Sequence, residues 1–421
     1  MQAQFQRQPL PQRFCNFDRL IDTMKRREVD GLVAYSRQNV FYLSGFPPHT
    51  ASPSTPYGAI VISRHAPDHP VAIIPDYGVA YFLTQPTWIE DIRAHQSTMV
   101  PLDIQIPGDE RLKRFVPPSA QDTNLYQHAN TYYAESLFEG VEGALKDLGL
   151  EAKRVGFDDY HLASQFSGTG LATMDGTGIF LHARAVKTDA ELDFIRAATT
   201  VNQTAIERTV ASWQRGMSWR EMVHTYDRTA VELGGFVRDP GGVVIANTVG
   251  ADPAFYLQSG VEDFIVEPGM HIMWDCHGTW NNYCWDGGKT WVVDGDVVGK
   301  GRQIADATAA SMQEVEAASR PGVRYSELSH IARDVYRKCG FTEADDIHIL
   351  FHGLGLDHVD MELTTARADG VLEEGMVIAA HLQVPADDRS RNWLEQLVIV
   401  GKDGGEPIFS WDYQPIPGSA A

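Results

Sequence analysis

Two aspartates stand 11 positions apart in a stretch rich in tryptophan, cysteine and asparagine. Asp275 and Asp286 both belong to WDCHGTWNNYCWDGG, residues 274–288, and the interval is 286 minus 275. The segments around them, HIMWDCHG and NNYCWDGGKTWVV, are strand-like, and a turn-like stretch containing asparagine separates them. If the two segments pair as a hairpin, Asp275 and His277 lie on one face and both carboxylates can converge. Converging carboxylates predict a metal site.

The second half of the chain offers further ligands for such a site. His352 ends the strand-like segment HILFH, His381 lies in GMVIAAHLQVP, and Glu395 lies in RNWLEQLVIV. Taken singly, each has an ordinary explanation, because a histidine after phenylalanine is usually half-buried and hydrogen-bonded and a lone strand glutamate is usually solvated. Taken together, imidazole and carboxylate groups suit Mn, Fe, Co or Zn better than Ca or Mg. We therefore expect a divalent ion of the first group.

The elements that must position these residues divide into two parts. In the first part, residues 17–46 predict an amphipathic helix, a buried strand (GLVAY) and a second short strand. YGAIVIS and HPVAIIPD add strands, and YYAESLFEGVEGALKDLGL predicts a helix before the strand RVGFDD. This alternation of strands and helices favours an α/β layer structure. We expect one domain over residues 1–182 and a second over residues 183–421.

The second part begins with a long helix. Thr188 and Glu191 satisfy the S/T-x-x-E capping box that marks a helix start. An apolar stripe at helical spacing follows it, formed by Leu192, Ile195, Ala198, Val201 and Ala205. The sequence therefore predicts that this helix packs against the core of the second domain.

An internal similarity indicates how the second domain is built. GMSWREMVHTYDRTAVELGGF, residues 216–236, resembles GVRYSELSHIARDVYRKCGF, residues 322–341, and the offset is 322 minus 216, or 106. Each predicted helix stops at glycine. Any two amphipathic helices with glycine caps share some of these features, which is the alternative explanation. We favour a duplicated helix-helix-strand unit, with two halves about a pseudo-twofold axis and the active site in the cleft between them.

Composition narrows the class of protein. The chain has 421 residues, 43% of them hydrophobic, which is enough for two or three globular domains. The net charge of −21 disfavours nucleic-acid binding, and no apolar run resembles a secretory signal or a membrane span. The four cysteines form no C-x-x-C pair and are expected to be reduced. We expect a cytoplasmic protein without nucleic-acid or membrane partners.

From about residue 17 to residue 400 the chain resembles the creatinase/aminopeptidase P/prolidase superfamily. The similar segments are NVFYLSGF, KTDAELDFIR, PGMHIMWD, HGLGLD and EEGMVIAA. The resemblance implies a small N-terminal α/β domain, a C-terminal domain with the pita-bread fold, and two metal ions. It places Asp275 on one ion, His352 on the other, and Asp286 and Glu395 between them. It also implies a homodimer.

The chain departs from the family pattern at the fifth metal position, where His381 stands for a glutamate. Three carboxylates instead of four would then face two divalent ions. With less negative charge around them, either the two ions act as a stronger Lewis acid or one ion is lost. His277 could compensate as a ligand, and a hydrogen-bonding role is its alternative. One or two ions per chain are therefore expected.

Four further departures concern substrate handling. Ala254 and Val359, the latter next to His358, align with positions where the family's peptidases carry histidine. Leu382 and Gln383 replace their proline and glycine. These differences favour the non-peptidase branches, which include creatinase, ectoine hydrolase and dimethylsulfoniopropionate lyase.

We therefore expect a metal-dependent enzyme that cleaves a small non-peptide substrate, by hydrolysis of a C–N bond or by elimination. In hydrolysis Glu395 or His358 would move the proton. In elimination Asp360 or Glu362 would be the base, unless both are ordinary exposed loop acids. Two alternatives stay open: an Xaa-Pro dipeptidase or aminopeptidase that tolerates His381, and a metal-free binding module with the pita-bread fold.

Overall fold

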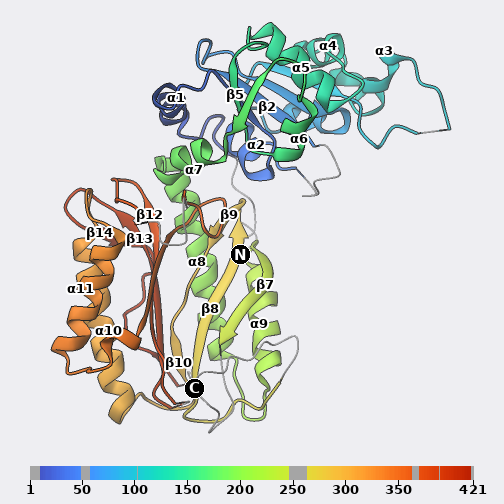
Figure 1. Ribbon diagram of the computed structural model, residues 1–421. Coiled ribbons are helices and arrows are strands. Elements are labelled where there is room, and N and C mark those ends of the chain that lie inside the picture. The colour runs from blue at the N-terminus through green and yellow to red at the C-terminus, as the bar shows by residue number, and fades with distance from the viewer. Residues whose placement is uncertain are drawn as a thin grey trace. The chain divides into compact units, whose positions relative to one another are not determined.

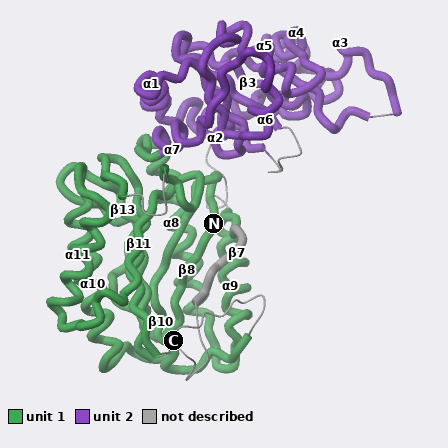
Figure 2. The backbone as a smooth tube through the Cα atoms, viewed as in Figure 1, with its two compact units in different colours: residues 1–7, 185–421 green, residues 8–184 purple. Residues whose placement is uncertain are grey.

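A computed structural model describes residues 10–48, 57–101, 103–245, 263–362, 369–387 and 389–418. The chain divides into two compact units (Figure 2). The N-terminal unit comprises residues 8–184, and the C-terminal unit comprises residues 1–7 and 185–421. The domain boundary expected between residues 182 and 183 stays a prediction.

The N-terminal unit is built on one six-stranded sheet with the order β4-β3-β2-β1-β5-β6. Its strands are β1 (Gly31–Ala34), β2 (Ala59–Ser63), β3 (Val71–Pro75), β4 (Asp91–His95), β5 (Arg154–Phe157) and β6 (Ala172–Asp175). Its helices are α1 (Phe17–Arg26), α2 (Arg37–Ser44), α3 (Gly108–Arg111), α4 (Asn124–Thr131), α5 (Leu137–Asp147), α6 (Tyr160–Gln165) and α7 (Thr177–Ala185). The strands β1, β2 and β3 are buried along their whole length, because helices such as α5 pack against the sheet. The expected α/β layer structure is confirmed.

One element of this unit was predicted wrongly. Arg37–Ser44 forms helix α2 and not a short strand. The Ser36 side chain caps its first turn by accepting a hydrogen bond from the Asn39 backbone N–H. Gly45 ends it in the left-handed conformation at φ +76°. Its last six residues are all buried, so the segment lacks the one-sided apolar stripe by which a surface helix is recognised.

The C-terminal unit contains two sheets. The first has the order β15-β10-β8-β7, with β9 paired to β8, and the second has the order β11-β12-β13-β14. The first sheet contains β7 (Phe236–Ile245), β8 (His271–Trp280), β9 (Tyr283–Trp285), β10 (Thr290–Val292) and β15 (Ile416–Pro417). The second contains β11 (His348–Gly353), β12 (Val377–Val384), β13 (Asn392–Val400) and β14 (Gly405–Pro407).

Each sheet is covered by its own helix pair. Helices α8 (Asp189–Ala211) and α9 (Trp219–Glu232) share a core with β8, β9 and β10. Helices α10 (Gly299–Ala318) and α11 (Tyr325–Lys338) share another with β11, β12 and β13. Figure 1 shows α10 and α11 along one side of the unit and α9 along the other, with the strands between them. As predicted, α8 begins with a capping box between Thr188 and Glu191.

The two halves of the C-terminal unit contain equivalent backbone hydrogen bonds. The Trp219 N–H donates to the Phe264 carbonyl, and 106 positions later the Tyr325 N–H donates to the Gly370 carbonyl. The isolated bridge between residues 218 and 265 likewise recurs between residues 324 and 371. Equivalent contacts at a constant offset are expected of a duplication and not of two unrelated amphipathic helices. The pita-bread architecture with two similar halves is confirmed.

The segment after the turn of the predicted hairpin differs from the expected single strand. NNYCWDGGKTWVV forms two short strands, β9 and β10, which are separated around Asp286, Gly287 and Gly288. Gly287 has φ +105°, a conformation that favours glycine. A Cβ on Gly288 would lie 2.4 Å from the Trp274 carbonyl oxygen. The break therefore lets the chain pass close to β8 directly after Asp286.

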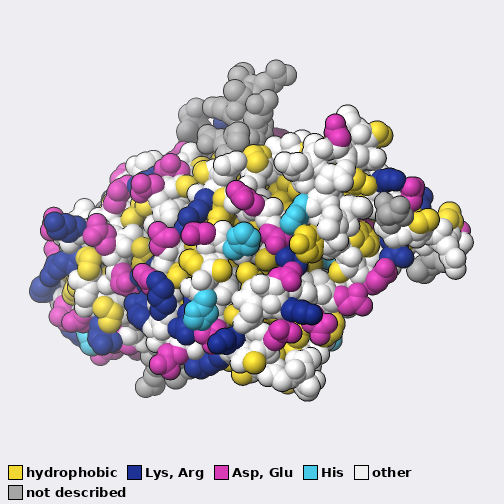
Figure 3. Space-filling view, turned by 90° about the horizontal axis from the view of Figure 1, so that it is seen from above, with side chains coloured by type: hydrophobic (Ala, Val, Ile, Leu, Met, Phe, Trp, Pro, Cys, Tyr) yellow, Lys and Arg dark blue, Asp and Glu magenta, His cyan; other side chains and the backbone are white. Residues whose placement is uncertain are grey.

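No helix in the described ranges is long and apolar enough to cross a membrane. Figure 3 shows one face of the molecule, on which acidic and basic side chains are interspersed. The net charge of −21 is therefore not gathered into one patch on that face.

Candidate metal centre

The centre forms where strands of the two halves meet. In the second sheet β12 and β13 pair in a register that places His381 directly opposite Glu395. His352 near the end of β11 pairs with Ala379, two residues before His381 on β12. The Glu395 backbone N–H donates to the Gly288 carbonyl of the first half at 2.9 Å. This bond holds β13 beside the break that carries Asp286.

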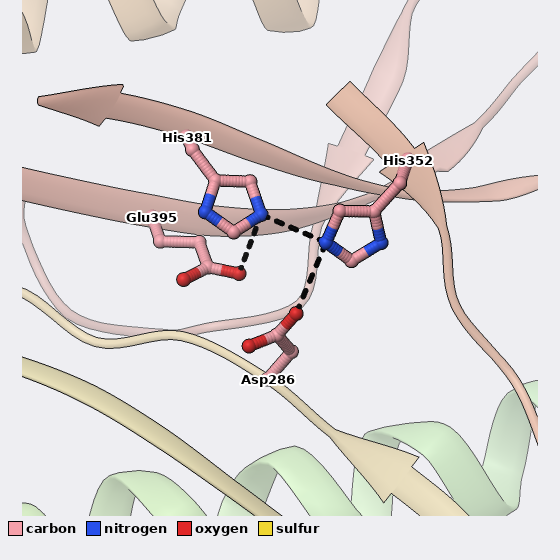
Figure 4. Close-up of side chains that lie close together, drawn as sticks. All are labelled: Asp286, His352, His381 and Glu395. Carbon is pink, nitrogen blue, oxygen red and sulfur yellow. Dashed lines mark hydrogen bonds and ion pairs between the residues drawn. The ribbon is translucent and has the colours of Figure 1, made fainter. Parts of the chain in front are cut away.

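Four side chains from both halves converge there (Figure 4). His381 Nε2 lies 3.2 Å from Glu395 Oε1 and 2.9 Å from His352 Nε2. His352 Nε2 lies 3.3 Å from Asp286 Oδ2. All four side chains are at most 8% exposed. The Asp286, His352, His381 and Glu395 side chains therefore meet in one buried cluster.

A second group of side chains adjoins the first through Asp286. His277 Nε2 lies 3.1 Å from Asp275 Oδ1 and also 3.1 Å from Asp286 Oδ1. His358 Nδ1 lies 3.4 Å from Asp286 Oδ2. The ring centroids of His277 and His358 are 4.2 Å apart. All six residues expected as metal ligands thus lie in one cluster, together with His358, which was expected to move protons.

Burial and close charges shift the protonation of these groups. Burial, with the negative charge of Asp286, raises the pKa of Glu395 well above its ordinary value. Burial opposes the ionisation of Asp286 too, but the nearby rings of His277 and His352 lower its pKa well below the usual range. Burial lowers the pKa of His381 to about 3. For His277 the contacts with Asp275 and Asp286 outweigh burial and raise the pKa to about 10.

The donor atoms fit a divalent cation. Among the described residues, no group donates a hydrogen bond to the four carboxylate oxygens of Asp286 and Glu395, although both side chains are buried. Buried carboxylates normally have donors or a cation as partners. His352 Nδ1 lies 3.0 Å from the Gly353 carbonyl, the contact by which ligating histidines are commonly oriented, so that Nε2 faces the cluster. The buried carboxylate oxygens, to which no described residue donates a hydrogen bond, and the oriented imidazoles together fit a divalent cation held by nitrogen and oxygen ligands.

Two acids that were expected as bases, Asp360 and Glu362, belong to neither group of candidate metal ligands among the described residues, and their role as bases stays a prediction. Asp360 is buried, and its Oδ2 accepts a hydrogen bond from the Leu356 N–H at 2.9 Å. A Cβ on Gly355 would lie 2.2 Å from the same oxygen. The Asp360 carboxylate therefore braces the turn that joins His352 to His358. Glu362 is partly exposed and ends a described range, and it belongs to neither ligand group.

Sequence reasoning missed a buried pair beside the centre. Lys187 and Glu191 are buried, and Glu191 Oε1 accepts a hydrogen bond from the Tyr283 hydroxyl at 3.1 Å. Burial raises the pKa of Glu191 to about 7, although the charge of Lys187 opposes the shift. The capping-box pattern explained Glu191 as a helix start and so concealed its contact with β9.

The two-sheet unit carries a buried cluster of aspartate, histidine and glutamate side chains of the kind that binds a divalent ion. Two family models match the chain. The model for metallopeptidase family M24 matches residues 193–402, and the model for the creatinase/prolidase N-terminal domain matches residues 17–186. The chain belongs to the creatinase/aminopeptidase P/prolidase superfamily, whose M24 enzymes use one or two divalent metal ions. This membership and the convergence of the ligands leave the metal-free binding module without support.

Relatives with assigned names are peptidases, and solved structures share the fold of the chain. The Xaa-Pro dipeptidase of Lactobacillus delbrueckii subsp. lactis is 25% identical over 59% of this chain and 66% of its own length. The structure of an Xaa-Pro dipeptidase from Bacillus anthracis matches with a TM-score of 0.70 at 18% identity, covering 95% of this chain and 98% of that one. X-Pro aminopeptidase from Thermotoga maritima MSB8 also gives 0.70, at 16% identity, with 94% and 99% covered. The two structures show the fold alone.

These findings overturn the expected non-peptide substrate, and neither a lyase nor a creatinase-like activity is supported. Two of the four departures behind that expectation have structural explanations. Leu382 is part of the apolar core of the second half, and the Gln383 side chain contacts His348 Nδ1 at 3.1 Å. Val359 is exposed, and Ala254 lies outside the described residues. Changes that serve packing say little about which bond is cleaved.

Proposed function

We propose that this protein is a metal-dependent peptidase that cleaves the bond before proline in short peptides, as an Xaa-Pro dipeptidase or aminopeptidase. The observation that carries the proposal is the shared group of Asp286, His352, His381 and Glu395, in a chain of a metallopeptidase family. The relatives named as Xaa-Pro dipeptidases supply the substrate class.

Asp286, His352, His381 and Glu395 would hold the ion. When bound, the ion would polarise the substrate carbonyl and acidify a water molecule. Glu395 is also the group we propose as proton acceptor, because its carboxylate lies in the ligand cluster, 3.2 Å from His381 Nε2. His381, which burial keeps neutral, would contribute a nitrogen ligand without adding negative charge.

Release of proline tests the proposal. Metal-free protein is loaded with Mn²⁺, Co²⁺ or Zn²⁺ and given Xaa-Pro dipeptides, Xaa-Pro-Ala tripeptides and matched Xaa-Ala dipeptides. We expect cleavage of at least one proline series and little cleavage of Xaa-Ala. Glu395→Gln should lower turnover by at least about 100-fold if Glu395 accepts the proton. Equal rates on proline and alanine peptides, or no cleavage of either, would contradict the proposed specificity.

Three finer features are part of the proposal. Iron or manganese are candidate ions, since both accept mixed imidazole and carboxylate ligands. A homodimer is proposed from resemblance to the family, and a cytoplasmic location is proposed from the composition of the chain. Sedimentation of the purified protein and fractionation of cells that express it test these two points.

A further inference from the structure

A buried lysine at the start of the C-terminal unit has no part in the proposed metal centre. Lys187 is 6% exposed and comes directly before the capping box of α8, which uses only Thr188 and Glu191. An ammonium group is seldom buried this deeply unless its surroundings compensate its charge. Helix capping therefore does not account for the burial of the Lys187 side chain.

The backbone of Lys187 is fixed to the chain that leads into β12. The Lys187 N–H donates to the Gly375 carbonyl at 2.9 Å. The preceding residue, Val186, forms an isolated bridge with Met376. The side chain of Lys187 therefore starts from a well-held point.

That side chain reaches the segment 353–360, the turn that follows β11. A Cβ on Gly355 would lie 3.2 Å from Lys187 Cε and 2.2 Å from Asp360 Oδ2. The end of the lysine and the Asp360 carboxylate thus approach the same backbone position from different segments. Only a residue without a side chain leaves room for both.

The charges of this group interact with a second acid. Burial raises the pKa of Glu191 to about 7, while the charge of Lys187 opposes the rise and the charge of Asp360 adds to it. Glu191 also accepts a hydrogen bond from the Tyr283 hydroxyl of β9, a strand that packs against α8 (Figure 1). Lys187 is the positive member of a buried group that includes two acids from different segments.

We infer that Lys187 is a positioning residue that holds the 353–360 turn, and with it His358, in place. The turn is closed locally by its own hydrogen bonds, since the Asp360 N–H donates to the Gly353 carbonyl at 2.8 Å. Lys187 adds a contact from outside the turn, and its charge offsets the charge of the Asp360 carboxylate.

His358 is the group whose placement matters most. Its side chain is 38% exposed, and its Nδ1 lies 3.4 Å from Asp286 Oδ2. An imidazole that solvent reaches beside the candidate ligands can meet an entering substrate, and a displacement of about 1 Å would weaken their alignment. The effect on turnover rests on the proposed peptidase function, whereas the placement of the ring does not.

Nuclear magnetic resonance of the histidine rings tests the placement without any activity measurement. Metal-free protein labelled with carbon-13 in its histidine rings is compared with Lys187→Met, which keeps a side chain of similar length without the charge. We expect the His358 signal, assigned by its loss in His358→Gln, to shift or broaden. The signal of His65 in the N-terminal unit should stay unchanged. An unchanged His358 signal in folded Lys187→Met would overturn the inference.

Thr188→Ala is the matched control. It removes the side-chain cap of the same helix start and leaves Lys187 in place. It should lower the stability of the protein without moving the His358 signal. An equal movement in this variant would show that any loosening of the helix start displaces the ring, and would also overturn the role of Lys187.

A double variant covers the case in which Lys187→Met does not fold. Lys187→Met combined with Asp360→Asn removes the uncompensated charge, while the amide oxygen can still accept the Leu356 N–H. Its His358 signal should differ from that of Asp360→Asn alone. Identical signals would mean that Lys187 does not position the ring.

Turnover gives a second readout. If the wild type cleaves Xaa-Pro dipeptides, Lys187→Met should lower kcat by about 10- to 100-fold, with KM and bound cobalt nearly unchanged. A normal kcat would contradict the role of Lys187. An inactive wild type would contradict the proposed peptidase alone, and the ring signals would still decide about Lys187.

Discussion

His381 faces Glu395 across two central strands, where the resemblance predicts a second glutamate. Burial keeps the imidazole neutral, so the ion-free centre avoids a further negative charge beside Asp286 and Glu395. With one carboxylate fewer, charge repulsion in the metal-free folded protein is smaller. The affinity of the centre for hard cations is also lower.

His381→Glu should reverse both effects. A further buried carboxylate beside Asp286 and Glu395 should destabilise the metal-free protein by several kcal/mol. Mn²⁺ should bind at least about 10-fold more tightly, because a carboxylate suits this ion better than an imidazole. Thermal melting with and without Mn²⁺ measures both. His381→Gln, which is neutral, is the control, and an unchanged melting temperature of metal-free His381→Glu would contradict the argument.

Glu191 predicts a pH dependence of stability. Burial raises its pKa from the ordinary 4.5 to about 7 in the folded protein. Its contribution is therefore fully present below pH 4.5 and is lost as the pH rises through about 7. Glu191→Gln cannot ionise, so its stability relative to wild type should improve between pH 5 and pH 8 by up to about 3 kcal/mol.

Denaturant unfolding at the two pH values measures this difference. Glu221→Gln is the matched control, because Glu221 occupies the same capping-box position in α9 but is exposed. Its effect should be similar at both pH values. A constant difference between wild type and Glu191→Gln would show that Glu191 does not titrate in this range.

At the scale of elements, local sequence patterns predicted which face of a strand each side chain lies on, but not which strands pair or in which register. Alternation along β8 correctly placed Trp274 and Cys276 in the core and Asp275 and His277 on the other face. The pairing of His381 with Glu395 could not be read in this way, because register depends on contacts between distant segments. The helix α2 was missed since burial on all sides removes the periodic signal.

The break between β9 and β10 carries an element-scale prediction. In Gly288→Ala the new methyl group would meet the Trp274 carbonyl at 2.4 Å and push β10 away from β8. We expect a loss of about 1–3 kcal/mol in the free energy of unfolding. Affinity for the metal ion should fall as well, because the Gly288 carbonyl binds the Glu395 N–H.

Urea unfolding and cobalt titration measure these two effects. Gly143→Ala in α5 is the control, since nothing lies within 4 Å of its added methyl group. It should stabilise the protein by about 0.5–1 kcal/mol. Normal metal affinity in Gly288→Ala would mean that the break does not position the ligands.

At the scale of the whole molecule, the two compact units have separate cores. The candidate metal ligands found among the described residues all belong to the C-terminal unit. Any ion that binds the folded state alone must therefore stabilise that unit.

Calorimetry with and without chelator tests this consequence. Addition of Zn²⁺ at about 100 times its dissociation constant should stabilise the C-terminal unit by about 3 kcal/mol. A chelator should reverse the change, and a transition of the N-terminal unit should not move. A shift of both transitions would show that the units unfold together.

The family, the two-part architecture and the duplication were all predictable, because motifs and an offset of 106 survive in the chain itself. The ligand cluster was predictable in its members, from residue types that are costly to bury without partners. The placement of Asp360 against the turn after β11 was not, since it depends on how that turn folds back. The substrate was predicted wrongly because packing changes at Leu382 and Gln383 were given a chemical meaning.

The ligands are divided unequally between the repeats. Of the candidate ligands, the first repeat carries Asp286 and His277, and the second carries His352, His358, His381 and Glu395. A polypeptide cut near Val298, which is exposed between β10 and α10, would yield two fragments with incomplete coordination spheres. Tight binding of cobalt would then require the two fragments to reassemble. Metal binding alone would therefore measure their association, as in a split-protein reporter.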